Sequence, residues 1–288
     1  MAEILKGAPV AAALSEELIA RAEKLKGAGT VPTLAILRLG ERPDDISYET
    51  GAMKRCAKVG IEVRHFLLPA DCTKEQLLDT IREINGDSSI HGCLMFRPLP
   101  DKDMEAAACA LLAPEKDVDC MTSGSLASVF TGKGAGYPPC TAQACIELLD
   151  HYGVDLTGKR AAVIGRSLVI GKPVSMMLQQ RNATVTMCHT RTVDMPGVCR
   201  GAEIIIAAAG KAGVVDKAFA APGQVIVDVG INVDENGRLC GDVKFDEVEP
   251  VAAAITPVPG GVGAVTTAVL AKHVIEAAEK ARSTDKAF

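Results

Sequence analysis

The sequence predicts an α/β protein with two domains, and three observations carry that prediction. The chain has 288 residues, enough for one large domain or two smaller ones. Apolar runs of strand length alternate with segments of helical period along the chain, as in βαβ units with a mostly parallel sheet. Between Cys120 and Cys140 the chain becomes rich in Gly, Ser, Thr and Pro, which is typical of a link between domains.

The first half alternates helices and strands. The short apolar runs at 34–37 and 92–96 suit strands that are buried on both faces of a sheet. In order, the patterns predict a helix over 9–26, a strand over 33–39, a helix over 46–59, a strand over 61–68, a helix over 74–84, a strand over 92–96 and a helix over 104–112.

The second half begins a new α/β series. The patterns predict a helix over 142–151, a strand over 160–164, a helix over 173–181, strands over 184–188, 204–208 and 224–229, a short strand near 254–256 and a final helix over 267–281. A Gly- and Pro-rich passage at 256–265 precedes that last helix. Periodicity alone leaves open on which domain the helix packs.

Composition excludes several classes of function. The chain has 31 Lys and Arg against 36 Asp and Glu, a formal charge of −5, and no basic run, so we expect no nucleic-acid partner. The amino terminus has no basic segment followed by an apolar run, and no stretch reaches the roughly 18 apolar residues of a spanning helix. We therefore expect a soluble, cytoplasmic protein without a membrane partner.

The cysteines point to packing rather than to metal binding. The sequence has 10 Cys, mostly inside apolar segments, with no C-x-x-C pair and no nearby His at the spacing of zinc ligands. We expect no metal site, and interpret the cysteines as small buried hydrophobic residues in a reducing cytosol.

The strongest local motif runs from a strand into a glycine-bearing loop and then a helix. Gly165 and Gly171 allow the backbone to approach a phosphate, and the N-terminus of the following helix supplies free N–H groups. Arg166 and Ser167 lie in the loop, and Pro173 stands near the first helical turn. The spacing differs from G-x-G-x-x-G, so an ordinary tight turn remains the alternative.

The end of the next strand favours NADP over NAD. An acidic residue at this place in a dinucleotide-binding βαβ unit takes the ribose hydroxyls, whereas basic and hydroxyl groups accommodate a 2′-phosphate. Here the strand ends in His189, Thr190 and Arg191, without an acid. Two alternatives stay open: Arg166 and Arg191 are solvated surface charges, or Thr190 and Arg191 bind an inorganic phosphate beside NAD.

A second group of polar residues lies in the first half. Asp117 and Asp119 follow a helix and precede the proposed link, and Ser47 and Tyr48 begin a helix after a G-x-x-P turn. Each residue taken singly is more typical of a helix cap or a surface position than of a catalyst.

Together the motifs identify a family. The ordered set resembles the bifunctional methylenetetrahydrofolate dehydrogenase/methenyltetrahydrofolate cyclohydrolase family over about 4–280. The motifs are Asp117-Val118-Asp119, Pro139-Cys140-Thr141, Gly165-Arg166-Ser167 with Gly171-Lys172-Pro173, Val227-Asp228-Val229-Gly230-Ile231-Asn232, Gly241-Asp242-Val243 and Thr256-Pro257-Val258-Pro259-Gly260-Gly261-Val262-Gly263.

The resemblance implies an architecture. It implies two α/β domains flanking a cleft: an N-terminal αβα folate-binding catalytic domain (1–121 plus 267–288) and a Rossmann-like NAD(P)-binding domain (139–266). It also implies a homodimer joined through the cofactor domains and a last helix that crosses back to the first domain. The implied substrates are tetrahydrofolate one-carbon derivatives, and the implied cofactor is NADP, with NAD as the alternative.

The resemblance also implies roles for single residues. Asp119 hydrogen-bonds the pterin, Tyr48 stacks beside the folate, and Pro259, Gly260 and Gly261 bring backbone close to the substrate. The implied cofactor-binding residues are Gly165, Arg166, Ser167, Gly171, Pro173, His189, Thr190, Arg191, Gly210, Ile231 and Thr266.

Two departures concern the hydrolytic reaction. Ala52 stands where the family has a catalytic Lys, and Phe96 where it has the Gln that tunes this Lys. We therefore expect a dehydrogenase whose cyclohydrolase activity is lost or weak. The alternatives are a fully bifunctional enzyme, in which Lys54, Arg97 or an ordered water replaces the pair, and a non-catalytic folate- or nucleotide-binding homologue. The milder departures Ala142, Ala264 and Val265 concern the shape of the folate pocket.

Overall fold

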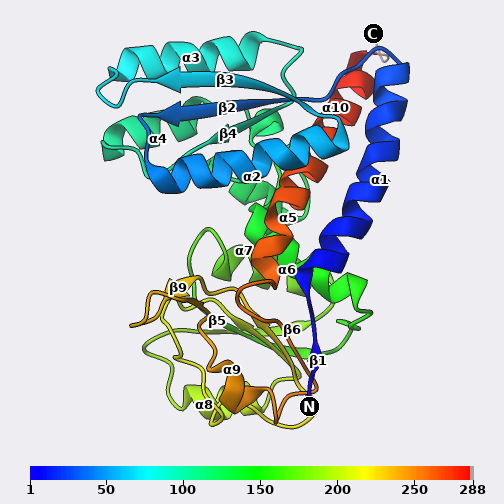
Figure 1. Cartoon of the computed structure of the whole chain (residues 1–288), viewed down its shortest axis with the longest axis vertical. Coiled ribbons are helices and arrows are strands. Elements are labelled where there is room, and N and C mark those ends of the chain that lie inside the picture. Colours follow the sequence, from blue (N-terminus) through cyan, green and yellow to red (C-terminus); the bar gives the residue numbers. More distant parts are fainter. Residues whose placement is uncertain (286–288) are drawn as a thin grey trace. The chain divides into compact units, whose positions relative to one another are not determined.

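The computed structural model describes residues 1–285, with side chains as far as Ser283. The chain divides into two compact units (Figure 1). We call residues 13–140 with 267–285 the three-stranded unit, and residues 1–12 with 141–266 the six-stranded unit. Residues 286–288 of the predicted folate-binding domain lie outside the described residues.

The three-stranded unit has a parallel sheet in the order β3-β2-β4. Every residue of the central strand β2 is buried, as the continuous apolar run predicts. In Figure 1 the sheet lies between α2 and α3. The strands are β2 (Thr33–Leu39), β3 (Glu62–Leu68) and β4 (Gly92–Met95), and the helices are α2 (Pro43–Val59), α3 (Lys74–Gly86), α4 (Lys102–Leu111) and η1 (Pro114–Lys116).

The segment predicted as an interdomain link is instead part of the three-stranded unit. It contains the helix α5 (Ser123–Thr131), which begins after Thr122, whose side-chain oxygen accepts the Ser125 N–H at 3.0 Å. Gly132 ends that helix with a φ of 68°. The prediction was wrong because small residues such as Ser and Thr suit a capped helix as well as a loop.

The six-stranded unit has a sheet in the order β1-β11-β8-β7-β5-β6, with every strand pair parallel. Its strands are β1 (Glu3–Ile4), β5 (Arg160–Ile164), β6 (Thr184–Cys188), β7 (Ile204–Ala207), β8 (Val225–Asp228) and β11 (Ala254–Ile255). A separate antiparallel pair joins β9 (Asn232–Val233) to β10 (Leu239–Cys240). The helices within this unit are α7 (Gly171–Gln180), α8 (Met195–Arg200), α9 (Phe245–Val248) and η2 (Val262–Ala264).

Three long helices have residues in both units. These are α1 (Gly7–Gly27), α6 (Cys140–His151) and α10 (Thr266–Asp285). The unit boundaries therefore fall inside helices rather than in loops.

The contacts of the first residues differ from the predicted domain division. They were predicted to start the folate-binding domain, but residues 1–12 group with the six-stranded unit. The Glu3 N–H donates to the Ala253 oxygen at 2.8 Å and the Leu5 N–H to the Ile255 oxygen at 2.9 Å. A strand of two residues has no periodicity, so only its pairing with β11 reveals it.

Residues 1–285 contain no helix long and apolar enough to cross a bilayer. In the same range, no group of three or more His, Cys, Asp or Glu side chains has the arrangement of a metal site. All ten cysteines are free, and all but Cys109 and Cys240 are buried.

Candidate active site

The loop after β5 has no room for side chains at its two glycines. Gly165 has a φ of 129°, and a Cβ there would lie 2.1 Å from the Ala208 oxygen. A Cβ on Gly171 would lie 2.3 Å from the Gly165 oxygen. Ser167 tightens the loop, because its Oγ accepts the Ile170 N–H at 3.1 Å. Ser167 also accepts the Gly171 N–H at 3.4 Å through Oγ and the Lys172 N–H at 3.0 Å through its carbonyl oxygen. The first amides of α7, which the sequence predicts to be free for a phosphate, therefore have acceptors within the loop.

The ends of β5 and β6 meet at one edge of the sheet. The Gly165 N–H donates to the Cys188 oxygen at 2.9 Å, which joins the glycine loop to the turn after β6. In that turn His189 Nδ1 accepts the Arg191 N–H at 3.1 Å. Arg166 and Arg191 are both exposed, so two guanidinium groups are available to an anion at this edge.

Other predicted cofactor residues follow neighbouring parallel strands. Gly210 comes after β7 with a φ of 64°, and Ile231 comes after β8 with its side chain exposed. The Thr266 hydroxyl donates to the Gly263 oxygen at 3.1 Å. Because β7 and β8 run parallel to β5 and β6, Gly210 and Ile231 lie at the same edge as the glycine loop.

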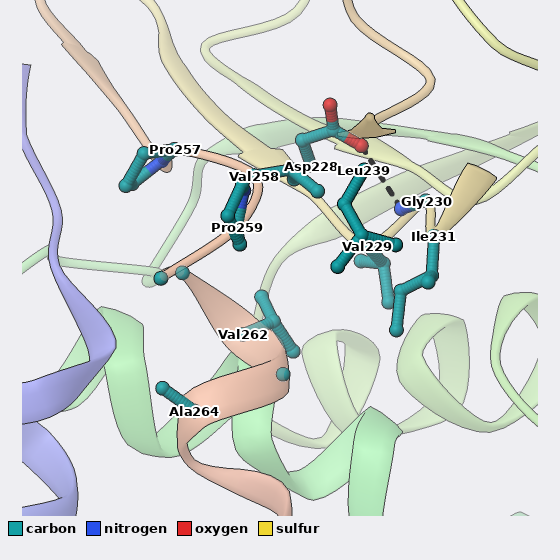
Figure 2. A pocket seen from close by; sticks show the side chains of 13 residues that line it. Asp228, Val229, Gly230, Ile231, Leu239, Pro257, Val258, Pro259, Val262 and Ala264 are labelled. Atoms are coloured by element: carbon teal, nitrogen blue, oxygen red, sulfur yellow. Dashed lines mark hydrogen bonds between the residues drawn. The ribbon is translucent and has the colours of Figure 1, made fainter. Parts of the chain in front are cut away.

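A pocket of about 300 Å³ lies within the six-stranded unit (Figure 2). Its lining includes Pro259, Gly260 and Gly261, which the sequence predicts to approach the substrate, together with the cofactor candidate Ile231. Gly260 has a φ of 99°, and a Cβ on Gly261 would lie 2.5 Å from the Pro257 oxygen. The tight turn therefore requires glycine at both positions.

Asp228 also lines this pocket, and the sequence assigned it no role. Its carboxylate accepts the N–H groups of Gly230, Asp242 and Val243 at 2.9–3.0 Å, and Figure 2 shows the first of these bonds. Its own N–H donates to Thr256 Oγ1 at 2.7 Å. Burial nevertheless raises the pKa of Asp228 to about 6. An acid at the end of an apolar strand, directly before Val-Gly, was the available signal.

The three-stranded unit brings Tyr48 and Phe96 together. Their ring centroids lie 6.0 Å apart, with the planes at 80°. Ala52 is one helical turn beyond Tyr48 and is 0% exposed, whereas Lys54 is exposed.

Asp119 lies beside β4. An isolated parallel bridge joins Asp117 to Cys93 of that strand, which places Asp119 near the strand's end. Asp119 Oδ1 accepts the backbone N–H of Cys140 at 3.0 Å. Burial raises the pKa of Asp119, and the nearby charge of Arg97 opposes this rise. Arg97, the residue after Phe96, thus brings a permanent positive charge close to the predicted pterin-binding carboxylate.

A second pocket, of about 550 Å³, lies at the carboxyl ends of β2 and β4. Phe96 lines it together with Leu39, Gly40, Arg42, Pro98 and Leu99, among others. The predicted site residues are divided between the two units. The three-stranded unit contains Tyr48, Ala52, Phe96 and Asp119, and the six-stranded unit contains the glycine loop and the Pro259–Gly261 turn.

Fold and sites define a two-unit α/β protein with a dinucleotide-type glycine loop in one unit and a carboxylate beside aromatic residues in the other. Residues 139–282 match the family model of the tetrahydrofolate dehydrogenase/cyclohydrolase NAD(P)-binding domain, and residues 5–119 match that of the catalytic domain. The chain belongs to the tetrahydrofolate dehydrogenase/cyclohydrolase family.

Relatives match over nearly the whole chain. The bifunctional protein FolD of Carboxydothermus hydrogenoformans is 51% identical over 281 residues, covering 97% of this chain and 98% of that protein. The crystal structure of the bifunctional enzyme FolD from Campylobacter jejuni has a TM-score of 0.92 at 36% identity, covering 97% and 99%. The Trypanosoma brucei FolD structure, complexed with NADP cofactor and inhibitor, has a TM-score of 0.89 at 34% identity, covering 97% and 98%.

Proposed function

We propose that this chain oxidises 5,10-methylene-tetrahydrofolate to 5,10-methenyl-tetrahydrofolate with NADP⁺. The observation that carries the proposal is the loop in which Gly165 and Gly171 have no room for a Cβ. This loop is joined to a turn that contains Arg191 and no acid at 189–191. The Trypanosoma brucei relative is complexed with NADP as its cofactor, which supports this choice over NAD.

The residues of this chain would act mainly by positioning. The loop from Gly165 to Gly171 and the N-terminus of α7 would hold the pyrophosphate, and Arg166, Thr190 and Arg191 the 2′-phosphate. When bound, NADP⁺ supplies a hydride acceptor. Asp119 would accept hydrogen bonds from the pterin, Tyr48 would stack beside the folate, and Gly260 and Gly261 would let backbone approach the substrate.

The oxidation asks for no strong base. The lone pairs of the two nitrogens that flank the one-carbon bridge assist departure of the hydride and share the resulting positive charge. The protein's contribution is then to hold two reactants in a reactive geometry, for which orientation alone accounts for a large part of the rate.

We further propose that the chain hydrolyses the methenyl product to 10-formyl-tetrahydrofolate. The relatives from Carboxydothermus hydrogenoformans and Campylobacter jejuni are named bifunctional. These names favour the fully bifunctional alternative over the loss of cyclohydrolase activity predicted from the sequence. Water activation then depends on groups other than those at positions 52 and 96.

A specific observation favours a second candidate function, that of a dehydrogenase with weak cyclohydrolase activity. Ala52 is fully buried and Phe96 packs against Tyr48, so neither position offers a group that moves a proton. A lysine in such a place would serve as a base only with a lowered pKa.

The proposal is tested by initial rates of methylene-tetrahydrofolate oxidation with NADP⁺, with NAD⁺, and with NAD⁺ plus inorganic phosphate. We expect the highest kcat/KM with NADP⁺. A higher value with NAD⁺ plus phosphate overturns the cofactor assignment. Binding of folate and nucleotide without turnover favours the non-catalytic homologue. A homodimer joined through the six-stranded unit remains a prediction.

A further inference from the structure

A buried histidine is hydrogen-bonded to the residue that precedes Asp119. His273 of α10 is 2% exposed, and its Nδ1 is 2.9 Å from the Val118 oxygen. A carbonyl oxygen only accepts, so Nδ1 carries the hydrogen of this bond. Burial lowers the pKa of His273 to about 4, so the ring is neutral at pH 7. The carbonyl that directly precedes Asp119 is therefore held by a defined tautomer.

Cys140 connects the same carbonyl to the Asp119 carboxylate. Its backbone N–H donates to Asp119 Oδ1 at 3.0 Å. Its Sγ lies 3.4 Å from the Val118 oxygen and 3.8 Å from His273 Nδ1. Because Nδ1 already carries a hydrogen, the thiol does not donate to it, and its partners are the Val118 oxygen and the Asp119 side chain. Cys140 thus contacts both the carbonyl before Asp119 and the Asp119 carboxylate.

The imidazole is fixed by a neighbouring ring. Tyr137 packs on His273 with centroids 5.1 Å apart and planes at 34°, and Lys280 Nζ lies 4.2 Å from the centre of the Tyr137 ring. The Tyr137 hydroxyl is buried without a hydrogen-bond partner among the described residues. Tyr137 therefore contacts His273 through its ring and not through a hydrogen bond of its hydroxyl.

We propose that His273 is a positioning residue that holds Asp119, through Val118 and Cys140, in the orientation that binds the pterin. The inference rests on the proposed function, in which Asp119 receives the substrate. His273 and Cys140 restrain the backbone before Asp119 and one carboxylate oxygen.

The test compares two substitutions of His273. His273→Asn keeps an N–H close to the place of Nδ1, whereas His273→Leu keeps bulk and removes the donor. His91→Leu is the matched control, because His91 is also buried in this unit and makes a hydrogen bond with Thr33 at 3.2 Å. Any general loss of stability should appear in both leucine variants.

We expect His273→Leu to raise KM for methylene-tetrahydrofolate about tenfold, the usual size of one lost buried hydrogen bond. KM for NADP⁺ should stay unchanged, and His273→Asn should remain within about threefold of wild type. The proposal is overturned if His273→Leu leaves the folate KM like that of His91→Leu, or if His273→Asn loses as much as His273→Leu.

A second readout is independent of turnover. The Asp119 carboxyl carbon is titrated by ¹³C NMR in the unliganded full chain, with Asp119→Asn as the assignment control. Burial raises this pKa and the hydrogen bonds from Cys140 lower it, so a change in the position of the carboxylate should shift it in His273→Leu and leave it in place in His273→Asn. An identical titration of Asp119 in both variants overturns the proposal. If the two variants differ in this way but the wild type does not oxidise methylene-tetrahydrofolate, only the proposed function is overturned.

Discussion

The rings of Tyr48 and Phe96 meet edge to face, with centroids 6.0 Å apart, in the three-stranded unit. The family's hydrolytic Gln is expected at position 96, so a ring contact replaces a polar group. Ala52, at the expected position of the catalytic Lys, is fully buried on the same helix as Tyr48. This arrangement raises the question of whether this chain activates water and with which groups.

Restoring the pair tests that question. For a bifunctional enzyme that uses other groups, we expect Ala52→Lys with Phe96→Gln to change methenyl-tetrahydrofolate hydrolysis by less than about threefold. The decay of methenyl absorbance measures the rate. A rise of tenfold or more would instead favour the dehydrogenase with weak cyclohydrolase activity. Circular dichroism checks that a lysine at this buried position leaves the chain folded.

The glycine loop should be sensitive to a single methyl group. Gly165→Ala should raise KM for NADP⁺ at least tenfold, because its Cβ would lie 2.1 Å from the Ala208 oxygen and the loop backbone would have to shift. Gly158→Ala is the matched control, since Gly158 also has a positive φ, of 72°, but nothing within 4 Å. Equal KM values in the two variants would refute a cofactor role for the loop.

Arg191 should discriminate between the two nicotinamide cofactors. Arg191→Ala is expected to lower kcat/KM for NADP⁺ about ten- to hundredfold, the size of one or two charge-assisted hydrogen bonds, and to leave the NAD⁺ rate nearly unchanged. Arg160→Ala is the control, because it removes another exposed charge, at the start of β5. If Arg191→Ala lowers kcat/KM equally for NADP⁺ and NAD⁺, Arg191 does not bind the 2′-phosphate.

Asp228 should make stability depend on pH. Its folded-state pKa of about 6 lies above the ordinary value of 3.8, so protonation of this carboxyl stabilises the folded state. This stabilisation, about 3 kcal/mol, is fully present below pH 3.8 and is lost as the pH rises through 6. Denaturant titrations of wild type and Asp228→Asn should therefore diverge toward pH 4, wild type gaining relative to the variant. A difference that is flat between pH 4 and 7 would contradict the raised pKa.

Much of the fold was predictable from local pattern. The run at Thr33–Leu39 and the strand at Arg160–Ile164 lie where predicted, because buried parallel strands are continuously apolar. The strand β1 was missed because two residues carry no period. The helix α5 was missed because its Thr122 cap resembles loop sequence.

The candidate site was predictable only in part, for a different reason. Glycines such as Gly165 can be recognised from the chain sequence alone, since strand, loop and helix are contiguous there. Asp228 binds groups from Gly230 to Thr256, and His273 reaches Val118 from a helix 155 positions away. Such roles arise from tertiary packing of segments that are distant along the chain, which no local spacing encodes.

The most direct test follows NADPH and methenyl-tetrahydrofolate together in one reaction begun with methylene-tetrahydrofolate, NADP⁺ and the full chain. We predict enzyme-dependent formation of NADPH, with less methenyl product present than NADPH because hydrolysis removes it. Equal amounts of the two would restrict the chain to the dehydrogenase reaction. No formation of NADPH, with both ligands shown to bind, would contradict the proposed function.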